Sequence, residues 1–171
     1  EASGSTLAYL QQDLATLNSP YPVTVFTDTV QVDVAEIREI DFEADPARAC
    51  QAAFDRVMET SKVYFETGSA TITRESGQTL DKLMAVSARC APGLVFEVGG
   101  HTDASGDRAA NLALSEARAL AVRDYMASAG FPPSRLTVIG SGPDEAVQSN
   151  DTEEGRAKNR RIGFKVRERS E

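Results

Sequence analysis

The sequence contains few residues of the kinds that bind metals, since it has only two cysteines and one histidine. A closed zinc site needs four such ligands, so we expect no metal site. The two cysteines, Cys50 and Cys90, could be buried free thiols or could form one disulfide in an exported protein. A bridge would close a loop of roughly 40 residues, worth about 3–5 kcal/mol in the chain-entropy model. The residues alone leave both possibilities open.

The chain also lacks long apolar runs and an excess of positive charge. No stretch approaches the ~18 consecutive apolar residues of a membrane-spanning helix. The net charge is −8, which argues against nucleic-acid binding, and the composition is that of a globular protein. The sequence begins at Glu1 rather than methionine. We therefore expect a processed or excised piece whose export signal or anchor lies outside it.

Residues 1–45 are predicted to form a small accessory α/β unit. Leucines at helical spacing predict a short helix over 6–17, and the prolines of "NSPYP" (18–22) end it. Alternating apolar and polar residues over 23–34 predict a β-hairpin. Such an α-β-β arrangement is too small to be stable alone unless something covers its sheet.

Residues 46–171 are predicted to form an α+β domain, a two-layer sandwich in which helices cover one face of a mixed four-stranded sheet. Asp45 is expected to cap the first helix, with Pro46 at its first position. After that helix the order is β-α-β-α-β-loop-β, and the loop, "SGPDEAVQSNDTEEG" (141–155), is rich in turn formers. Helices are expected over 46–60, 74–89 and 107–129, and strands over 61–67, 94–100, 135–140 and 160–166.

Polar side chains follow the strand predicted at 94–100. "HTD" (101–103) comes directly after two glycines at the carboxyl end of that strand, the edge where α/β sheets favour ligand sites. In the next helix, Asn111, Ser115 and Arg118 are spaced i, i+4 and i+7 and therefore share one polar stripe. The loop and the helix are thus candidates for one site.

Asp103 can fold back towards Arg118, which would place a carboxylate and a guanidinium across a short gap. Such a pair suits a zwitterionic ligand, because the carboxylate would hold the ligand's ammonium and the guanidinium would bind its carboxylate bidentately. The alternative is an internal salt bridge that pins the loop to the helix. Spacing alone favours the salt bridge, since structural ion pairs outnumber ligand clamps.

Catalysis is not favoured by these residues. His101, Asp103 and Ser105 or Ser115 could be combined into a triad, but they crowd together and lack a nucleophile elbow. Asp103 and Glu116 could be paired for glycoside hydrolysis, but nothing marks either carboxylate as protonated or buried. We predict that the protein is not an enzyme and that His101 fixes the loop through a hydrogen bond.

Two separated motifs resemble the OmpA-like peptidoglycan-associated domain family. "GHTDASGDRAANLALSEARALAV" (100–122) and "GRAKNRRIGF" (155–164) are similar, in that order, to the family's GHTD…N…LS…RA pattern and its later GR…NRR. "VYFETGSATI" (63–72) resembles the family's first strand and turn. The resemblance covers roughly residues 60–167, and two motifs in the right order make it specific.

The resemblance implies a non-catalytic domain, without a cofactor, that binds peptidoglycan through the diaminopimelate residue of the stem peptide. Asp103 and Arg118 would hold the ammonium and carboxylate groups of that residue. Asn111 would lie beside the pocket and Arg160 at its wall. The loop after the strand would add backbone contacts from Thr102, Ser105 and Gly106. Gly99 stands where the family often has glutamate.

The family also implies a location in the periplasm, in association with the outer membrane or cell envelope. That oxidising compartment favours a Cys50–Cys90 disulfide over two free thiols. The unit at 1–45 resembles a piece of a BON-type envelope module. The implied function is to tether an outer-membrane or envelope protein to the cell wall, with any membrane contact made by a segment outside this sequence. The alternative is a periplasmic scaffold that binds another envelope protein.

Overall fold

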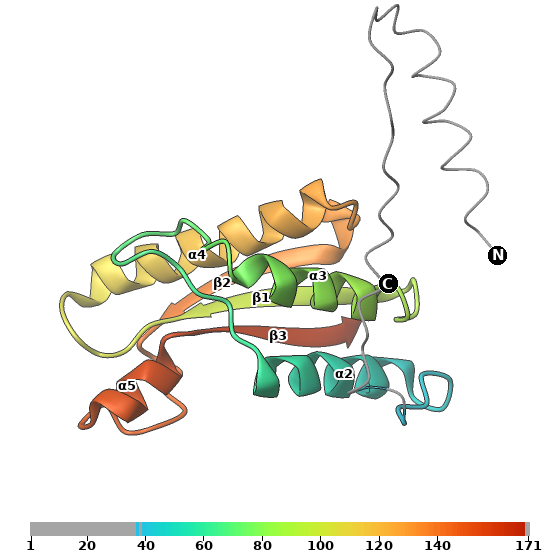
Figure 1. Cartoon of the computed structure of the whole chain (residues 1–171), viewed down its shortest axis with the longest axis horizontal. Helices are drawn as coiled ribbons and strands as arrows, with labels where there is room; N and C mark the ends of the chain where they lie inside the picture. Colours follow the sequence, from blue (N-terminus) through green and yellow to red (C-terminus); the bar gives the residue numbers. More distant parts are fainter. Residues whose placement is uncertain (1–36, 38, 170–171) are drawn as a thin grey trace, which may run out of the picture. The chain divides into compact units, whose positions relative to one another are not determined.

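A computed structural model of the chain describes residues 37 and 39–169 (Figure 1). The helix predicted at 6–17 and the hairpin predicted at 23–34 lie outside the described residues, so the accessory unit stays a prediction. The described elements are α2 (Pro46–Thr60), α3 (Ser76–Ser87), β1 (Leu94–His101), α4 (Arg108–Ser128), the 3₁₀ helix η2 (Pro133–Arg135), β2 (Leu136–Gly142), α5 (Glu153–Asn159) and β3 (Arg161–Glu168).

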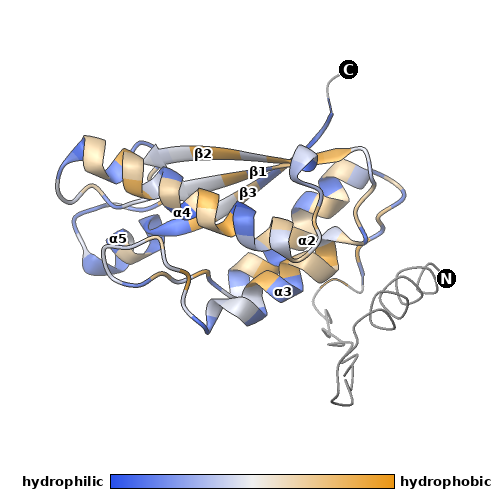
Figure 2. Cartoon of the chain, turned by 90° about the horizontal axis from the view of Figure 1, so that it is seen from above, coloured by the Kyte–Doolittle hydropathy of each residue, from blue (hydrophilic) through white to orange (hydrophobic). Residues whose placement is uncertain are grey.

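The described strands form a three-stranded mixed sheet with the order β2-β1-β3. The central strand β1 pairs in parallel with β2, where Val98 lies opposite Val138, and antiparallel with β3, where Val98 lies opposite Phe164. The helices cover one face of this sheet: α4 packs on β1 and β2, α2 packs on β3, and α3 lies against α2 and α4 (Figures 1 and 2). The predicted α+β class and its two layers are confirmed.

The fourth strand predicted at 61–67 is wrong, because this segment is extended but is not a strand of the sheet. Its only bridge in the described part of the chain joins Phe65 to Ile72. Ser76 at the start of α3 holds its backbone: Tyr64 N–H donates to Ser76 Oγ at 2.7 Å, and that hydroxyl donates to the Tyr64 carbonyl at 3.0 Å. A side chain thus satisfies backbone groups that a neighbouring strand would otherwise bind.

The core lies between the sheet and the helices and contains a cluster of aromatic rings. Alternation along β1 directs Leu94, Phe96 and Val98 towards the helices, where all three are buried. The Phe96 ring lies 5.2 Å, between centroids, from Phe54 of α2 and 5.1 Å from Phe131 after α4. These rings fix both outer helices against the central strand.

Two glycines allow α4 to approach the sheet closely. A Cβ atom on Gly100 would lie 1.9 Å from the Ser115 carbonyl oxygen, and one on Gly140 would lie 2.6 Å from Glu116 Cβ. Ser115 also joins the helix to β2, since its Oγ accepts a hydrogen bond from Gly142 N–H at 2.9 Å. The first half of α4 is therefore held directly on the ends of β1 and β2, next to the loop that carries the candidate site.

Local capping signals account for the helix ends, including those of a helix that was not predicted. Asp45 Oδ1 accepts from Arg48 N–H at 3.1 Å with Pro46 in the first turn of α2, as predicted. The short helix α5 begins within the predicted loop 141–155 and extends beyond it to Asn159. Its cap is Thr152, whose Oγ1 accepts from Gly155 N–H at 3.1 Å. The helix is seven residues long, so the surrounding turn formers dominate the sequence pattern.

Cys50 and Cys90 form a disulfide, which joins α2 to the turn after α3. Their Cα atoms are 5.5 Å apart, and the bridge closes a loop with a sequence separation of 40 residues. The pairing that the family resemblance implies is therefore confirmed. In the part of the chain described here, no helix is both long and apolar enough to cross a membrane.

Candidate functional site

Asp103 lies in the loop after β1, only 9% exposed, and accepts hydrogen bonds on both carboxylate oxygens. Oδ2 accepts from Arg160 Nη1 at 2.7 Å, and Oδ1 accepts from Ser105 N–H at 2.9 Å. Burial alone would raise the pKa of Asp103, but the hydrogen bonds from Arg160 and Ser105 outweigh burial and lower it. The carboxylate is therefore ionised at neutral pH and held in a fixed position.

Arg118 projects from α4 near this carboxylate but does not pair with it. Its Nε donates to the Ser69 carbonyl at 3.0 Å, and its guanidinium carbon lies 5.0 Å from the centroid of the Phe65 ring. Burial lowers the pKa of Arg118, with a further lowering by Arg160 and an opposing effect of Asp103. Among the described residues, Arg118 forms no ion pair. The Asp103–Arg118 salt bridge favoured by spacing alone is wrong, because Arg160 takes that place.

Arg160 binds two carboxylates, one through each of its terminal nitrogens. Besides Asp103, it binds Glu153 Oε1 through Nη2 at 2.7 Å. These two hydrogen bonds raise the pKa of Arg160. The structure thus brings together three of the predicted site residues, Asp103, Arg118 and Arg160, and adds Glu153 from the helix that was not predicted.

The other predicted site residues shape the loop that carries Asp103. Asn111 Nδ2 donates to the Ser105 carbonyl at 2.8 Å. Gly106 has a φ of +84°, which residues with a Cβ rarely adopt. Thr102 N–H donates to the Gly142 carbonyl at 2.9 Å, while its buried Oγ1 has no hydrogen-bond partner within the described part of the chain. In this structure, Asn111, Gly106 and Thr102 therefore position the loop.

Asn159, the first residue of "NRR" in the second motif, was not predicted as a site residue and organises the opposite side of the site. It is fully buried, and its Oδ1 accepts from Val147 N–H at 2.8 Å and Gln148 N–H at 3.0 Å. Its Nδ2 donates to Asn150 Oδ1 at 3.0 Å, and that oxygen also accepts from Ala104 N–H at 3.1 Å. Asn159 thereby connects the loop before α5 to the loop of Asp103. The signal for it was its place in "NRR" (159–161).

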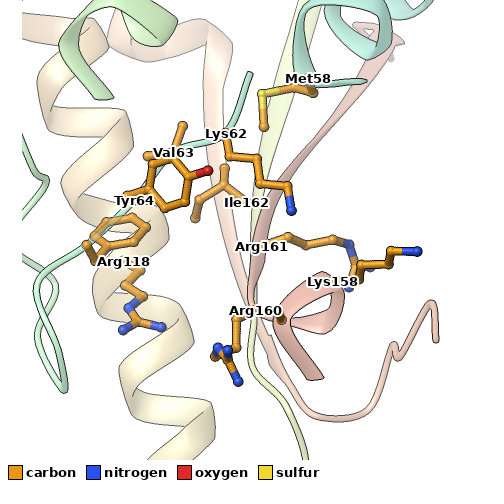
Figure 3. A pocket seen from close by; sticks show the side chains of 11 residues that line it. Met58, Lys62, Val63, Tyr64, Arg118, Lys158, Arg160, Arg161 and Ile162 are labelled. Carbon is orange, nitrogen blue, oxygen red and sulfur yellow. The ribbon is translucent and has the colours of Figure 1, made fainter. Parts of the chain in front are cut away.

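A cavity of about 550 Å³ opens beside Arg118 and Arg160 (Figure 3). Its walls are the extended segment before α3, α4, α5 and the beginning of β3. It is lined by five cationic side chains and no carboxylate, together with apolar ones. The lining residues are Met58, Lys62, Val63, Tyr64, Phe65, Arg118, Ala157, Lys158, Arg160, Arg161 and Ile162. The volume is in the range of small-molecule and peptide sites, and the lining favours an anionic group.

His101 lies apart from this cavity, on the face of the sheet that the helices leave uncovered. A Cβ on Gly99 would lie 3.1 Å from its Nε2, and one on Gly163 would lie 3.6 Å away, so the two glycines make room for the ring. Nδ1 is buried, lies 4.0 Å from Glu145 Oε2 and has no hydrogen-bond partner in the described residues. The predicted loop-fixing hydrogen bond of His101 is therefore not formed at this atom.

His101 should make the stability depend on pH in the acid range. Burial lowers its pKa to about 4, with Arg161 and Lys165 adding to this and Glu145 opposing it. In the unfolded chain the imidazole takes up a proton near its ordinary pKa of about 6.5. The free energy of unfolding should therefore fall as the pH drops from about 6.5 towards about 4. In H101Q this part of the pH dependence should disappear, as measured by urea denaturation across that range. A slope equal to that of the wild type would contradict the assignment.

Comparison with known sequences places these motifs in a family. Residues 64–160 match the sequence model of the OmpA family. Outer membrane protein A of Bordetella avium is 35% identical over 111 residues, which cover 65% of this chain and 57% of that protein. The peptidoglycan-associated lipoprotein of Agrobacterium fabrum is 37% identical over 100 residues, which cover 58% and 56%. The matched part thus spans a little over half the length of these relatives.

Solved structures have the same fold. A putative MotB-like protein from Desulfovibrio vulgaris aligns with a TM-score of 0.56 at 28% identity, covering 63% of this chain and 71% of that one. The cell wall anchor of the T6SS from Pseudomonas aeruginosa aligns with a TM-score of 0.54 at 28% identity, covering 62% and 75%. Because the sequence model matches more than half of the residues and includes the first motif and the beginning of the second, this chain belongs to the OmpA family.

Proposed function

We propose that this chain binds peptidoglycan through the diaminopimelate residue of the stem peptide and so tethers an envelope protein to the cell wall. The observation that carries the proposal is the pairing of Asp103 with Arg160 beside an Arg118 that has no ion-pair partner among the described residues. The side-chain end of diaminopimelate carries one ammonium and one carboxylate. Its ammonium would bind the ionised Asp103, and its carboxylate would bind the guanidinium of Arg118.

The charges and the hydrogen-bonding capacity of the site support a zwitterionic ligand. Asp103 and Glu153 balance the positive charges of Arg118 and Arg160, so a ligand end with no net charge suits the site. A carboxylate has about four acceptor positions, and Asp103 uses two of them for Arg160 and Ser105 N–H. It can therefore accept a ligand ammonium without losing the bonds that hold it.

A binding role is supported further by the engagement of Ser115. Its Oγ donates to the Leu112 carbonyl at 2.8 Å and accepts from Gly142 N–H at 2.9 Å. The hydroxyl proton is thus donated to a backbone carbonyl, whereas a nucleophilic serine would give its proton to a general base. We infer that the site holds its ligand without cleaving it.

The relatives support the cellular setting of this proposal. Their names describe an outer membrane protein, a peptidoglycan-associated lipoprotein and a cell wall anchor. The Cys50–Cys90 disulfide fits an oxidising compartment. These observations support our proposal that the chain acts in the periplasm, in association with the outer membrane or cell envelope.

The proposal is tested by sedimentation with purified sacculi. The chain should pellet with sacculi whose stem peptides contain diaminopimelate, and free meso-diaminopimelate should release it. Sacculi with lysine at the same position are the matched control, because lysine lacks the second carboxylate, and the chain should stay in solution with them. Equal pelleting with both kinds of sacculi would contradict recognition of diaminopimelate. Binding to an envelope protein without any binding to sacculi would instead support the scaffold alternative.

A further inference from the structure

We propose that the cavity beside Arg118 is a second subsite, in which Lys62 and Lys158 bind a carboxylate of the stem peptide that lies outside the diaminopimelate residue. The inference rests on the proposed function and adds a ligand group to it. The shared chemistry is a carboxylate on a short extended peptide. It can come from the free α-carboxylate that a γ-linked glutamate retains or from a carboxyl-terminal alanine.

The positive charge of the cavity is the first support for this subsite. Lys62 comes from the extended segment before α3 and Lys158 from α5, so the two ammonium groups belong to opposite walls (Figure 3). Neither lysine forms an ion pair with a described residue. Arg161 lies between these walls, and its hydrogen bonds go to the carbonyls of Glu145 at 3.0 Å and Asn159 at 3.4 Å. No carboxylate lines the cavity to offset this repulsion, which a bound anion would relieve.

Unpaired backbone groups are the second support. On the outer edge of β3, Gln51 of α2 acts in place of a neighbouring strand: its Nε2 donates to the Phe164 carbonyl at 2.9 Å, and its Oε1 accepts from Val166 N–H at 2.7 Å. Since alternate residues of a strand point their N–H and C=O groups to the same edge, those of Ile162 also face outward. No side chain bonds to them in the described residues, and Ile162 is one of the residues that line the cavity.

The opposite wall offers a matching segment. Val63 lies in the extended stretch between the backbone bonds of Lys62 and Tyr64 to α3 side chains, and its own N–H and C=O form no hydrogen bond with a described residue. A peptide that occupies the cavity would lie against Val63 and Ile162, which both line it, and could bond to their backbones as a strand added to a sheet edge does. The apolar side chains of Met58 and Phe65 complete the lining and suit alkyl parts of the ligand.

The position of the cavity identifies its occupant. Arg118 and Arg160 line one end of the cavity, while Lys62, Lys158 and Arg161 lie towards the other (Figure 3). A ligand whose diaminopimelate is held at Asp103 and Arg118 therefore has its neighbouring residues beside the two lysines. A stem peptide meets this requirement because its backbone continues on both sides of diaminopimelate.

The experiment compares free meso-diaminopimelate with L-Ala-γ-D-Glu-meso-diaminopimelate by isothermal titration calorimetry. The wild type should bind the tripeptide about tenfold more tightly, as expected for one additional, partly exposed charge pair with its backbone bonds. The double variant K62A/K158A should bind the tripeptide no more tightly than free diaminopimelate. Its affinity for free diaminopimelate should equal that of the wild type. The matched control K165A/R167A removes two charges from the uncovered face of the sheet and should leave both affinities unchanged.

Modified peptides identify the carboxylate and separate the possible outcomes. If the glutamate carboxylate is the ligand group, its amidation should lower wild-type affinity about tenfold and leave K62A/K158A unaffected. If the terminal alanine supplies it, the tetrapeptide and its carboxyl-terminal amide should show this difference instead. Equal affinity of the wild type and K62A/K158A for both the tripeptide and the tetrapeptide, with diaminopimelate still bound, would overturn the subsite alone. Absence of binding by free diaminopimelate and by every peptide would overturn the proposed function itself.

Discussion

Replacement of Arg118 by alanine should lower the affinity for diaminopimelate-containing peptides about a hundredfold. The guanidinium is half-buried and, among the described residues, is not engaged by a carboxylate, so its charge is available to the ligand. Loss of one partner of a desolvated, hydrogen-bonded charge pair costs about 2–5 kcal/mol, and about 2.8 kcal/mol corresponds to a hundredfold change. Calorimetry with free meso-diaminopimelate and sedimentation with sacculi measure the effect.

Three further variants sharpen this test. R118K keeps the charge but loses the planar bidentate fork, so its affinity should lie between those of the wild type and R118A. D103N removes the charge that would hold the ammonium, and its loss should be comparable to that of R118A. R123A is the matched control on the same helix, because Arg123 pairs with its neighbour Asp124 instead. Arg118 also bonds to Ser69, so thermal unfolding must show that R118A remains folded. Wild-type affinity in folded R118A would contradict the assignment.

Replacement of both Cys50 and Cys90 by alanine should lower the free energy of unfolding by about 4 kcal/mol. This is the chain-entropy value for a closed loop of about 40 residues, the separation found here. Since domains of this size are stable by only about 5–15 kcal/mol, the loss is a large part of the total. Urea denaturation of the oxidised wild type and the double variant, under the same conditions, measures it.

The disulfide also affects the site, because its loop contains the extended segment that lines the cavity. Lys62 and Val63 lie within this loop, as does Ser69, which accepts the hydrogen bond from Arg118. A chemical reductant should bring the stability of the wild type down to that of the double variant. A thiol assay in denaturant should find no reactive thiol in the oxidised protein. Two reactive thiols, or a double variant as stable as the wild type, would contradict the bridge.

The elements that the sequence predicts correctly are those with strong local signals. α2 has a cap at Asp45 followed by Pro46, and α4 begins after the cap Asp107, whose Oδ1 accepts from Ala110 N–H at 2.8 Å. β1 is an apolar run that ends in two glycines. In each of them the determining residues are close together in the chain, so the pattern alone is sufficient. The motifs similarly identified Asp103 and Arg160, although their pairing was not foreseen.

The errors concern interactions between residues far apart in the chain. The segment 61–67 has the β-branched and aromatic residues of a strand, but a hydroxyl from Ser76 takes its backbone bonds. The carboxylate of Asp103 pairs with Arg160, 57 residues away. The helical spacing had suggested Arg118 as its partner. Asn159 connects two loops that no local pattern brings together. These hydrogen-bond partners depend on which polar groups the packed core brings into contact. The spacing of residues along one helix or strand cannot predict them.

The single amide of Gln51 has a consequence for how copies of this protein behave at high concentration. A strand at the edge of a sheet has unpaired backbone N–H and C=O groups. Strands of other molecules can pair with these groups, which leads to aggregation. Gln51 occupies the C=O group of Phe164 and the N–H group of Val166, so a strand of a second copy cannot pair with β3 at these groups. Gln51 therefore protects the middle of β3 from strand pairing between copies without covering the backbone at Ile162.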